Sequence, residues 1–436
     1  MNASAPFWAD VLDDAPPIGV VALGARPRRV HTAVIGAGLT GLSAAYHLLL
    51  HRPDREVAIL EATRVGAGAS TRSTGMLTPG VGQNLAGLVR RVGHDMARGM
   101  YQASLRAVDY VHELTAAEGI DCELTRSGQL IVSRAHRGRQ RLAAQARAYR
   151  DLDLPCEVLD DAALAAKIRL APAPARADGL PAALRLPDAG TLHPGKLVRG
   201  LLEAVRRRGG TVYEDARVTE VARDRPSEIR LAEGAPVIAD EVVLATAGYT
   251  ADLRILRGRI LPVQLCALAT EPLGAATLAA LGWHGREAII DSRRLFNYFR
   301  LTSDDRIVFG GGAPRYAWGG GSGDGSGQRA LAKLRAELAL TPARGWTGVI
   351  GYVADAMPVI QRLAGRPSIV HVGGWCGHGI ALGVASGAWV AHLLTGDGPP
   401  EALAWFRDRA PLVPTELIRW LSFRTAVSMM AFLDRV

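Results

Sequence analysis

In the first half of the chain, the pattern of apolar and polar residues predicts buried strands that alternate with amphipathic helices. From His31 to Glu61 the order is strand, helix, strand, because two apolar runs, Val34-Ile35 and Val57 to Leu60, flank a stretch with helical spacing. Further helices are predicted at residues 88–118, 137–150 and 162–167, with a short hairpin at 124–132.

The second half returns to this alternation and then changes to strands. The pattern predicts helices at 197–207 and at about 380–394, and strands at 212–214, 218–221, 241–245 and 369–372. Between them, the pattern over residues 260–312 predicts only strands. In Phe296 to Arg300, for example, successive side chains point to opposite faces with period two. An α/β sequence interrupted by strand-rich stretches indicates two interleaved domains.

Composition narrows the class of protein. A chain of 436 residues with 48% hydrophobic and 21% charged residues has the length of two packed domains and a globular composition. The net charge of +9 comes mainly from arginines spread along the chain, since lysine appears only as Lys167, Lys196 and Lys333. Without a recognised nucleic-acid motif, this dispersed charge argues against nucleic-acid binding.

The cysteines and the termini indicate a cytoplasmic protein. Cys122, Cys156, Cys266 and Cys376 lack C-x-x-C and zinc-type spacing, so no metal site is expected and reduced thiols are the simplest interpretation. The first 30 residues contain acidic residues and no apolar core of a signal peptide. No apolar run reaches membrane-spanning length.

A glycine turn after the first strand carries the strongest chemical signal. Gly36 permits the tight turn, Gly38 lets backbone amides approach a pyrophosphate, and Gly41 lets the following helix pack closely on the strand. Glu61 ends the second strand, where a carboxylate can accept hydrogen bonds from the hydroxyl groups of an adenosine ribose. With both strands, the helix and the acid in order, nucleotide binding is favoured over a purely structural turn.

An ordered set of motifs resembles the D-amino-acid oxidase superfamily of flavoproteins, in particular its glycine/sarcosine oxidase and γ-glutamylputrescine oxidase branches. The motifs cover nearly the whole chain: the Gly36–Gly41 turn, residues 68–77, Leu192-His193-Pro194, residues 243–248, residues 298–312 and Gly373 to Gly379. The resemblance implies an α/β fold, with an FAD-binding Rossmann-like domain of the glutathione-reductase type and an interleaved substrate domain on a mixed β-sheet.

The resemblance also implies domain boundaries. The expected segments are a leader at 1–29, the FAD-binding domain at 30–90, 186–256 and 346–400, the substrate domain at 91–185 and 257–345, and a helical tail at 401–436.

Cofactor contacts are implied by the same motifs. Residues expected at FAD are Gly36, Gly38, Leu39, Thr40, Gly41, Glu61, Ala62, Gly68, Ser70, Thr71, Arg72, Ser73, Gly75, Met76, Leu77, Val218, Ala247, Gly248, Gly374, Gly377, His378, Gly379 and Ile380. Ser70 to Ser73 offer donors for pyrophosphate and ribityl oxygens, although a purely structural role in the loop stays open. No cysteine or histidine matches a defensible flavin-linking position, so the FAD is expected to be non-covalent.

The resemblance implies oxidation of the C–N bond of an amine or amino acid by hydride transfer to flavin. Tyr298, Arg300 and His378 are the catalytic candidates; Tyr298 and Arg300 share one strand face and are expected at the substrate. The alternatives are a structural pair of side chains and a histidine that only caps the last helix. Two other functions stay open: an NAD(P)-dependent dehydrogenase and a flavin-binding subunit without turnover.

Two departures from the family bear on substrate and electron acceptor. Ile350 stands where relatives that act on small α-amino acids carry an arginine for the carboxylate, so a different amine or a longer amino acid is expected. No lysine lies between Lys196 and Lys333, which removes the oxygen-activating lysine of sarcosine-oxidase relatives. O2 is the expected acceptor, with a quinone as the alternative.

The C-terminal tail is amphipathic and contains Trp420 and Arg424, which suit an interface. Docking of this helix on the protein or on a partner subunit is the favoured interpretation. Peripheral membrane contact, which would favour a dehydrogenase, is the alternative.

Overall fold

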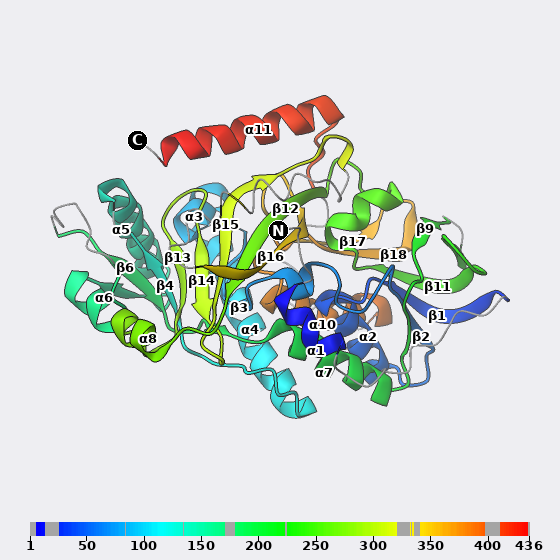
Figure 1. Cartoon of the computed structure of the whole chain (residues 1–436). Coiled ribbons are helices and arrows are strands. Elements are labelled where there is room, and N and C mark those ends of the chain that lie inside the picture. The colour runs from blue at the N-terminus through cyan, green and yellow to red at the C-terminus, as the bar shows by residue number, and fades with distance from the viewer. Residues whose placement is uncertain are drawn as a thin grey trace.

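The computed structural model describes residues 6–13, 26–82, 84–133, 135–170, 179–222, 225–320, 332, 334, 341–396 and 410–434. Two large sheets stand side by side (Figure 1). The first has the order β17-β18-β11-β1-β2-β8, and β10 and β9 extend it from β11. Its strands are β1 (Arg28–Ile35), β2 (Val57–Leu60), β8 (Thr211–Tyr213), β9 (Val218–Val221), β10 (Ser227–Leu231), β11 (Val237–Leu244), β17 (Val359–Leu363) and β18 (Arg366–Gly373).

Parallel pairing organises this first sheet. β1 lies between β2 and β11, parallel to both, and apolar side chains on its two faces enter two different core clusters. Burial on both faces explains the continuous apolar runs of these strands. Helices α2 (Leu39–His51), α7 (Pro194–Arg207) and α10 (Ala381–Thr395) contribute to one of these clusters. The predicted strand–helix–strand unit at 31–61 is therefore confirmed.

Small residues let α10 pack directly against α2. A side chain at Gly387 would place its Cβ 2.2 Å from the hydroxyl oxygen of Ser43, and one at Gly383 would lie 2.8 Å from the hydroxyl of Thr40. Ser43 also donates a hydrogen bond to the carbonyl oxygen of Val384 (2.5 Å). Helices 340 residues apart in sequence therefore lie in close contact.

The second sheet is mixed and lies in the other half of the molecule. Its order is β16-β12-β15-β14-β13-β4-β6-β5, with β13 and β4 parallel and the other pairs antiparallel. The strands are β4 (Gln129–Val132), β5 (Glu157–Leu159), β6 (Ala183–Leu186), β12 (Leu261–Thr270), β13 (Ala288–Asp291), β14 (Tyr298–Leu301), β15 (Ile307–Arg315) and β16 (Pro342–Tyr352). The chain alternates between the two sheets, as the interleaved fold class requires.

The remaining elements surround these sheets (Figure 1). They are η1 (Phe7–Ala9), α1 (Asp10–Asp13), η2 (Ala69–Arg72), β3 (Met76–Leu77), α3 (Leu85–Val92), α4 (His94–Glu118), α5 (His136–Asp151), α6 (Asp161–Lys167), β7 (Gly190–Thr191), η3 (Ala247–Leu253), α8 (Ala275–Leu281), η4 (Trp318–Gly320) and α11 (Glu416–Leu433). The expected domain boundary at 345/346 falls inside β16. No helix in the described ranges is long and apolar enough to cross a membrane.

Three local predictions are wrong. The helix expected at 88–118 is two helices, because Gly93 adopts a φ of +83° between α3 and α4. The hairpin expected at 124–132 is the single strand β4, whose partners β6 and β13 come from distant sequence. The all-strand prediction for 260–312 misses α8, a short run of alanine, leucine and threonine.

His371 is fully buried in β18, between the strands β17 and β11 of the first sheet. Within the described part of the chain, neither of its ring nitrogens has a hydrogen-bond partner. Burial disfavours the charged imidazolium and lowers the pKa of His371 to about 4. The ring therefore stays neutral in the folded protein at neutral pH.

This burial predicts a pH-dependent loss of stability. Below the ordinary pKa of 6.5, the unfolded chain protonates this ring while the folded chain does not until its pKa of about 4. Stability therefore falls as the pH drops between these values, by about 2 kcal/mol at about pH 5 from His371 alone. We expect His371→Leu to lose less melting temperature between about pH 7 and pH 5 than the wild type.

His94→Leu is the matched control, because His94 is exposed at the start of α4. It should keep the wild-type pH dependence. An unchanged pH dependence in His371→Leu, measured by thermal unfolding, would contradict the prediction.

Candidate cofactor and active site

The glycine turn between β1 and α2 is built as the sequence predicts. Gly36 has a φ of +104°, and a Cβ there would lie 2.8 Å from the carbonyl oxygen of Ala245. A Cβ at Gly41 would lie 1.9 Å from the carbonyl oxygen of Gly36, so only glycine permits this approach of helix to turn. Gly38 precedes α2 without a side-chain cap, which leaves the positive end of the helix available to an anion.

A second helix N-terminus lies beside this turn. The turn from Gly373 to Ile380 leads from β18 into α10, and Ile380 also provides no side-chain cap. The indole N–H of Trp375 donates to the hydroxyl oxygen of Thr40 (3.1 Å), which ties this turn to the first turn of α2. Gly374 and Gly377 adopt φ values of +76° and +111° and permit the sharp bend before Gly379.

Glu61 lies at the carboxyl end of β2, as predicted. Its carboxylate accepts hydrogen bonds from the backbone N–H groups of Ala37 (2.9 Å) and Thr63 (3.1 Å), and Ala62 also contributes a backbone contact. Burial raises the pKa of Glu61, although these N–H donors oppose the rise. The acid is thus fixed next to the glycine turn, where a ribose is expected.

The side chains of the 66–75 loop hold the loop together. The Ser70 hydroxyl accepts from the N–H of Leu39 (3.0 Å), and the Thr71 hydroxyl donates to the carbonyl of Gly66 (2.8 Å). Arg72 donates to the carbonyls of Ala67 and Thr347, both at 2.8 Å, and Ser73 donates to the carbonyl of Ser70. These bonds support the structural role that the sequence left open, and contact of Ser70 to Ser73 or Gly68 with the cofactor stays a prediction.

Three side chains from different elements hold three consecutive carbonyl groups of this loop. The indole N–H of Trp346 in β16 donates to the carbonyl of Arg72 (3.1 Å), and that of Trp8 in η1 donates to Ser73 (2.8 Å). The guanidinium of Arg300 in β14 donates to Thr74 (2.7 Å). The leader, the second sheet and the loop are therefore fixed to one another at this point, with Trp8 anchoring the leader.

Arg300 of β14 donates hydrogen bonds to three backbone carbonyl groups. It is buried, and besides Thr74 it donates to the carbonyls of Leu192 (2.6 Å) and Leu301 (3.2 Å), while Trp8 stacks on it at 4.9 Å. Burial lowers its pKa to about 10, so it stays charged at neutral pH. The guanidinium donates to backbone carbonyls, which supports a positioning role, and its expected contact with the substrate stays a prediction.

Tyr298 lies on the same strand, against β15. A Cβ at Gly310 would fall 2.2 Å from its ring, so the glycine makes room for the ring across the neighbouring strand. Burial raises the pKa of Tyr298 to about 12, so its hydroxyl stays protonated at neutral pH. Its contact with substrate stays a prediction.

His378 lies over the segment that follows β3. Its ring faces Gly80, where a Cβ would lie 2.7 Å from the ring, and its Nδ1 is 3.4 Å from the hydroxyl oxygen of Thr78. Burial lowers the pKa of His378 to about 4. A neutral imidazole therefore borders the segment at one end, while Arg300 holds Thr74 at the other end. Thr78 and Gly80 are not among the residues predicted from the sequence, because neither belongs to a recognisable motif.

The segment between these two residues contains β3. Met76 and Leu77 pair with Thr191 and Gly190 of β7, and Gly75 adopts a φ of +75°. A Cβ at Gly75 would lie 2.8 Å from the Arg300 guanidinium. Gly75, Met76 and Leu77 are therefore fixed between Arg300 and His378, which agrees with their expected place beside the flavin ring.

Two further predicted positions lie at the end of β11 and in β9. Ala247 and Gly248 begin the helical turn η3, and a Cβ at Gly248 would lie 2.8 Å from the carbonyl oxygen of Ile350. Val218 is the first residue of β9. Their contact with the adenine half of the cofactor stays a prediction.

The comparisons with known proteins now identify the family. Residues 31–393 match the family described as FAD dependent oxidoreductase (DAO), so the chain belongs to this family and is an FAD-dependent oxidoreductase. It is 30% identical over 374 residues to gamma-glutamylputrescine oxidoreductase of Escherichia coli, covering 84% of this chain and 83% of the relative. It is 23% identical to sarcosine oxidase subunit beta of Rhizobium meliloti, covering 86% of each.

A solved structure shares the fold. Glycine oxidase from Geobacillus kaustophilus superposes with a TM-score of 0.69 at 19% identity, covering 88% of this chain and 100% of that one. The predicted fold class is therefore confirmed.

The residues present fit FAD. Two helix N-termini lie side by side, one after β1 and one after β18, and the Trp375–Thr40 bond joins them. Their N-cap residues provide no side-chain cap, and at α2 the Ser70 hydroxyl takes up only the N–H of Leu39. Such a pair offers backbone donors to a pyrophosphate and to the end of a ring system that gains negative charge on reduction. The Glu61 carboxylate stands beside the first N-terminus.

The Arg300 contacts predict a positioning role with a distinct signature. A lysine ammonium lacks the planar fork with which the Arg300 guanidinium donates hydrogen bonds to three carbonyl groups. For Arg300→Lys we therefore expect the free energy of unfolding to fall by about 3 kcal/mol and FAD to bind more weakly. At saturating FAD, KM for substrate should stay near the wild-type value. Denaturant unfolding, FAD titration of the apoprotein and steady-state kinetics measure the three effects.

Arg139→Lys is the matched control, since Arg139 is equally buried but pairs with Asp161 far from the loop. It should lose stability without losing FAD affinity. A raised KM with unchanged stability in Arg300→Lys would instead place Arg300 at the substrate.

Proposed function

We propose that this protein oxidises the C–N bond of an amine or a longer amino acid and passes the electrons to O2. The observation that carries the proposal is the convergence of the Gly36–Gly41 turn, the Gly377–Ile380 turn and the Gly75–Leu77 segment, each held by its own contacts. FAD, when bound, accepts the hydride from the carbon next to the substrate nitrogen. The oxidised C=N product is then hydrolysed by water.

In this proposal the chain's own residues orient the reactants and exclude water. The His378 imidazole, neutral because its pKa is about 4, orients the substrate by accepting a hydrogen bond from the amine at Nε2 while Nδ1 faces Thr78, and the ammonium form of the substrate loses its proton to water. A free amine has the nitrogen lone pair that the oxidised C=N bond requires. Ile350 and Tyr352 bound the substrate on β16 and form part of an apolar cluster with Leu261 and Val263.

The apolar wall at Ile350 supports a preference against small zwitterionic amino acids. A carboxylate placed against it would lose water without gaining a cationic partner. The relative named gamma-glutamylputrescine oxidoreductase gives a precedent for an extended amine. We therefore propose a primary or secondary amine carrying a longer chain as the substrate class.

Oxygen as the acceptor is supported by a fixed positive charge beside the proposed flavin segment. Arg300 stays protonated at neutral pH and lies against Gly75. The described lysines have other partners, since Lys167 pairs with Glu287 (3.2 Å) and Lys196 with Glu123 (2.8 Å). In this proposal the two electrons and two protons removed from the amine reduce O2 to H2O2.

Non-covalent FAD is part of the proposal. Cys376 is the cysteine in the Gly373–Ile380 turn, and burial raises the pKa of its thiol to about 12. A thiol held protonated is a poor nucleophile for attachment to a ring. Acid precipitation of the yellow protein should release all of the FAD into the supernatant.

The experiment that tests the function is anaerobic reduction of the purified flavoprotein by a panel of amines, polyamine conjugates, sarcosine and D-amino acids. Loss of flavin absorbance with an extended amine, followed by one H2O2 per product in air, is the expected result. Bleaching without peroxide, together with dye reduction, would indicate a dehydrogenase. Failure of every amine to bleach the flavin would favour a flavin-binding subunit.

Ile350 provides a specificity prediction. Ile350→Arg supplies a bidentate partner for a carboxylate, so we expect kcat/KM for glycine or D-alanine to rise about tenfold or more and that for an extended amine to fall. Ile350→Met, which changes shape without adding charge, is the control and should leave the substrate order unchanged. High activity of the wild type on D-alanine alone would contradict the interpretation of this position.

A further inference from the structure

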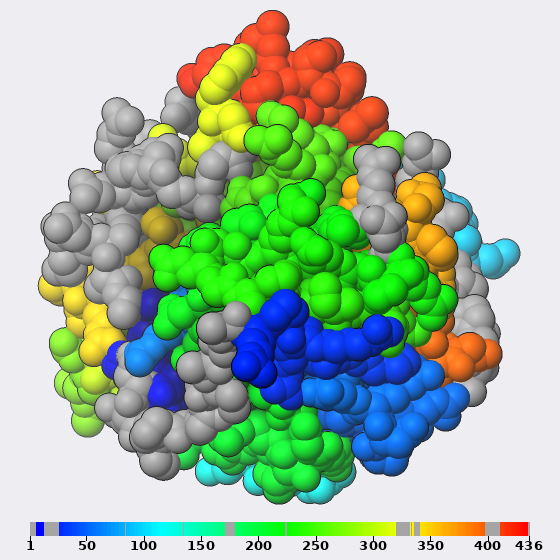
Figure 2. All heavy atoms as spheres, turned by 90° about the vertical axis from the view of Figure 1, so that its right-hand side faces the viewer, coloured from blue at the N-terminus to red at the C-terminus, as the bar shows by residue number. Residues whose placement is uncertain are grey.

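The outward face of α11 is uncharged and carries large apolar side chains toward both ends of the helix. The helix lies across the outside of the molecule, over β15 and η4, and stands out at its upper edge (Figures 1 and 2). Five large apolar side chains on this face are between 47% and 64% exposed: Leu417, Ile418, Leu421, Met429 and Phe432. At 100° per residue they fall within one sector of the helix, which they share with Thr425 and Ser428.

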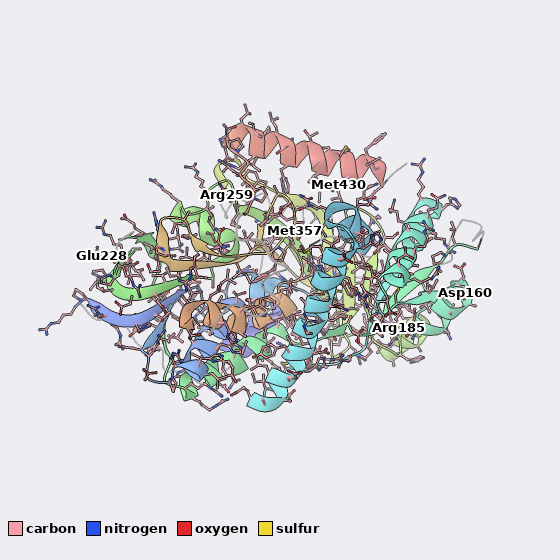
Figure 3. All side chains as sticks on the ribbon, turned by 180° about the vertical axis from the view of Figure 1, so that it is seen from behind. Asp160, Arg185, Glu228, Arg259, Met357 and Met430 are labelled. Atoms are coloured by element: carbon pink, nitrogen blue, oxygen red, sulfur yellow. The ribbon has the colours of Figure 1, made fainter. Side chains whose placement is uncertain are left out.

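The opposite face of α11 is docked on the body. Phe423 packs on Tyr316 with 5.9 Å between ring centroids, and buried Arg419 donates to the carbonyls of Val413 and Pro414. Met430 lies toward the far end of the helix (Figure 3). The helix is therefore anchored to the body through its inner face. Its outer face stays exposed although the helix is docked.

Both acidic side chains of the helix region turn inward. The Glu416 carboxylate accepts from the N–H of Gly319 (2.8 Å), the hydroxyl of Tyr316 (3.2 Å) and Arg419. The Asp434 carboxylate accepts from the N–H groups of Arg294 and Leu295, both at 2.9 Å. No acid of the described helix therefore borders its outer apolar sector.

Cationic and aromatic groups border this sector instead. The guanidinium of exposed Arg424 lies 4.5 Å from the ring of Trp420, and Trp318 packs edge-on against that ring and is exposed.

We propose that the outer face of α11 binds the surface of an anionic phospholipid bilayer, with the helix lying in the plane of the interface. Apolar side chains enter the boundary between headgroups and acyl chains, while arginines and tryptophans suit the headgroup level. The chain's net charge of +9 favours the same surface. An anionic bilayer offers acyl chains to the uncharged apolar sector and negatively charged headgroups to its cationic border.

This surface lies one layer from the proposed substrate wall. Trp420 and Phe423 on the inner face of α11 belong to the same apolar cluster as Ile350 and Tyr352 of β16. The inference itself does not rest on the proposed reaction, because it uses only the exposed face and its border.

Vesicle flotation tests the proposal with the full-length holoprotein. We expect binding to phosphatidylcholine vesicles that contain phosphatidylglycerol, weaker binding to phosphatidylcholine alone, and loss of the difference at high salt. Leu421→Ser/Phe432→Ser should lower the partition coefficient about tenfold or more. Arg424→Gln should lower it about fivefold on the anionic vesicles only.

The matched control is Leu50→Ser/Val158→Ser, which removes two apolar side chains of similar exposure, 52% and 53%, away from α11. It should bind like the wild type, and flavin absorbance with thermal unfolding verifies that each variant is folded. Equal vesicle binding by Leu421→Ser/Phe432→Ser and the wild type would overturn the proposal. So would absence of vesicle binding together with a concentration-dependent dimer, seen by light scattering, that this variant abolishes.

Discussion

The direct contact between α2 and α10 is the constraint on which the proposed cofactor site depends. Gly383 and Gly387 of α10 leave room only for the small side chains of Thr40 and Ser43 of α2, and Trp375 bonds Thr40 where both helices begin. Two helix N-termini thereby face the same region and together offer positive partial charge to an extended anionic dinucleotide. Any bulk in this contact would separate the two turns, because packed interiors leave no space to absorb it.

A second constraint comes from the carbonyl groups of the 72–74 loop. Buried backbone carbonyls need donors, and here the donors are Trp346, Trp8 and Arg300, from three parts of the chain. The loop therefore has one arrangement only when the leader and strands β14 and β16 of the second sheet are in place. Arg300, which the sequence places at the substrate as an expectation, bonds three backbone carbonyls in the fold.

The proposed substrate wall and the proposed membrane surface lie next to each other on the outer side of the second sheet. β16 presents Ile350 and Tyr352 to an apolar cluster that Trp420 and Phe423 of α11 complete. The same helix exposes an apolar sector to its surroundings and turns Glu416 and Asp434 inward. One element thus takes part in the wall of the proposed substrate site and in the proposed membrane surface.

The amino-acid order alone determined the Rossmann unit and the family, because Gly36, Gly41 and Glu61 act through local backbone geometry that their spacing reveals. Strand partners such as β4 with β13, the break at Gly93 and the three carbonyl contacts were decided by tertiary structure. These features depend on which hydrogen-bond donor or apolar face, distant in sequence, lies nearby in the folded chain. Local periodicity carries no information about residues that meet only after the chain has folded.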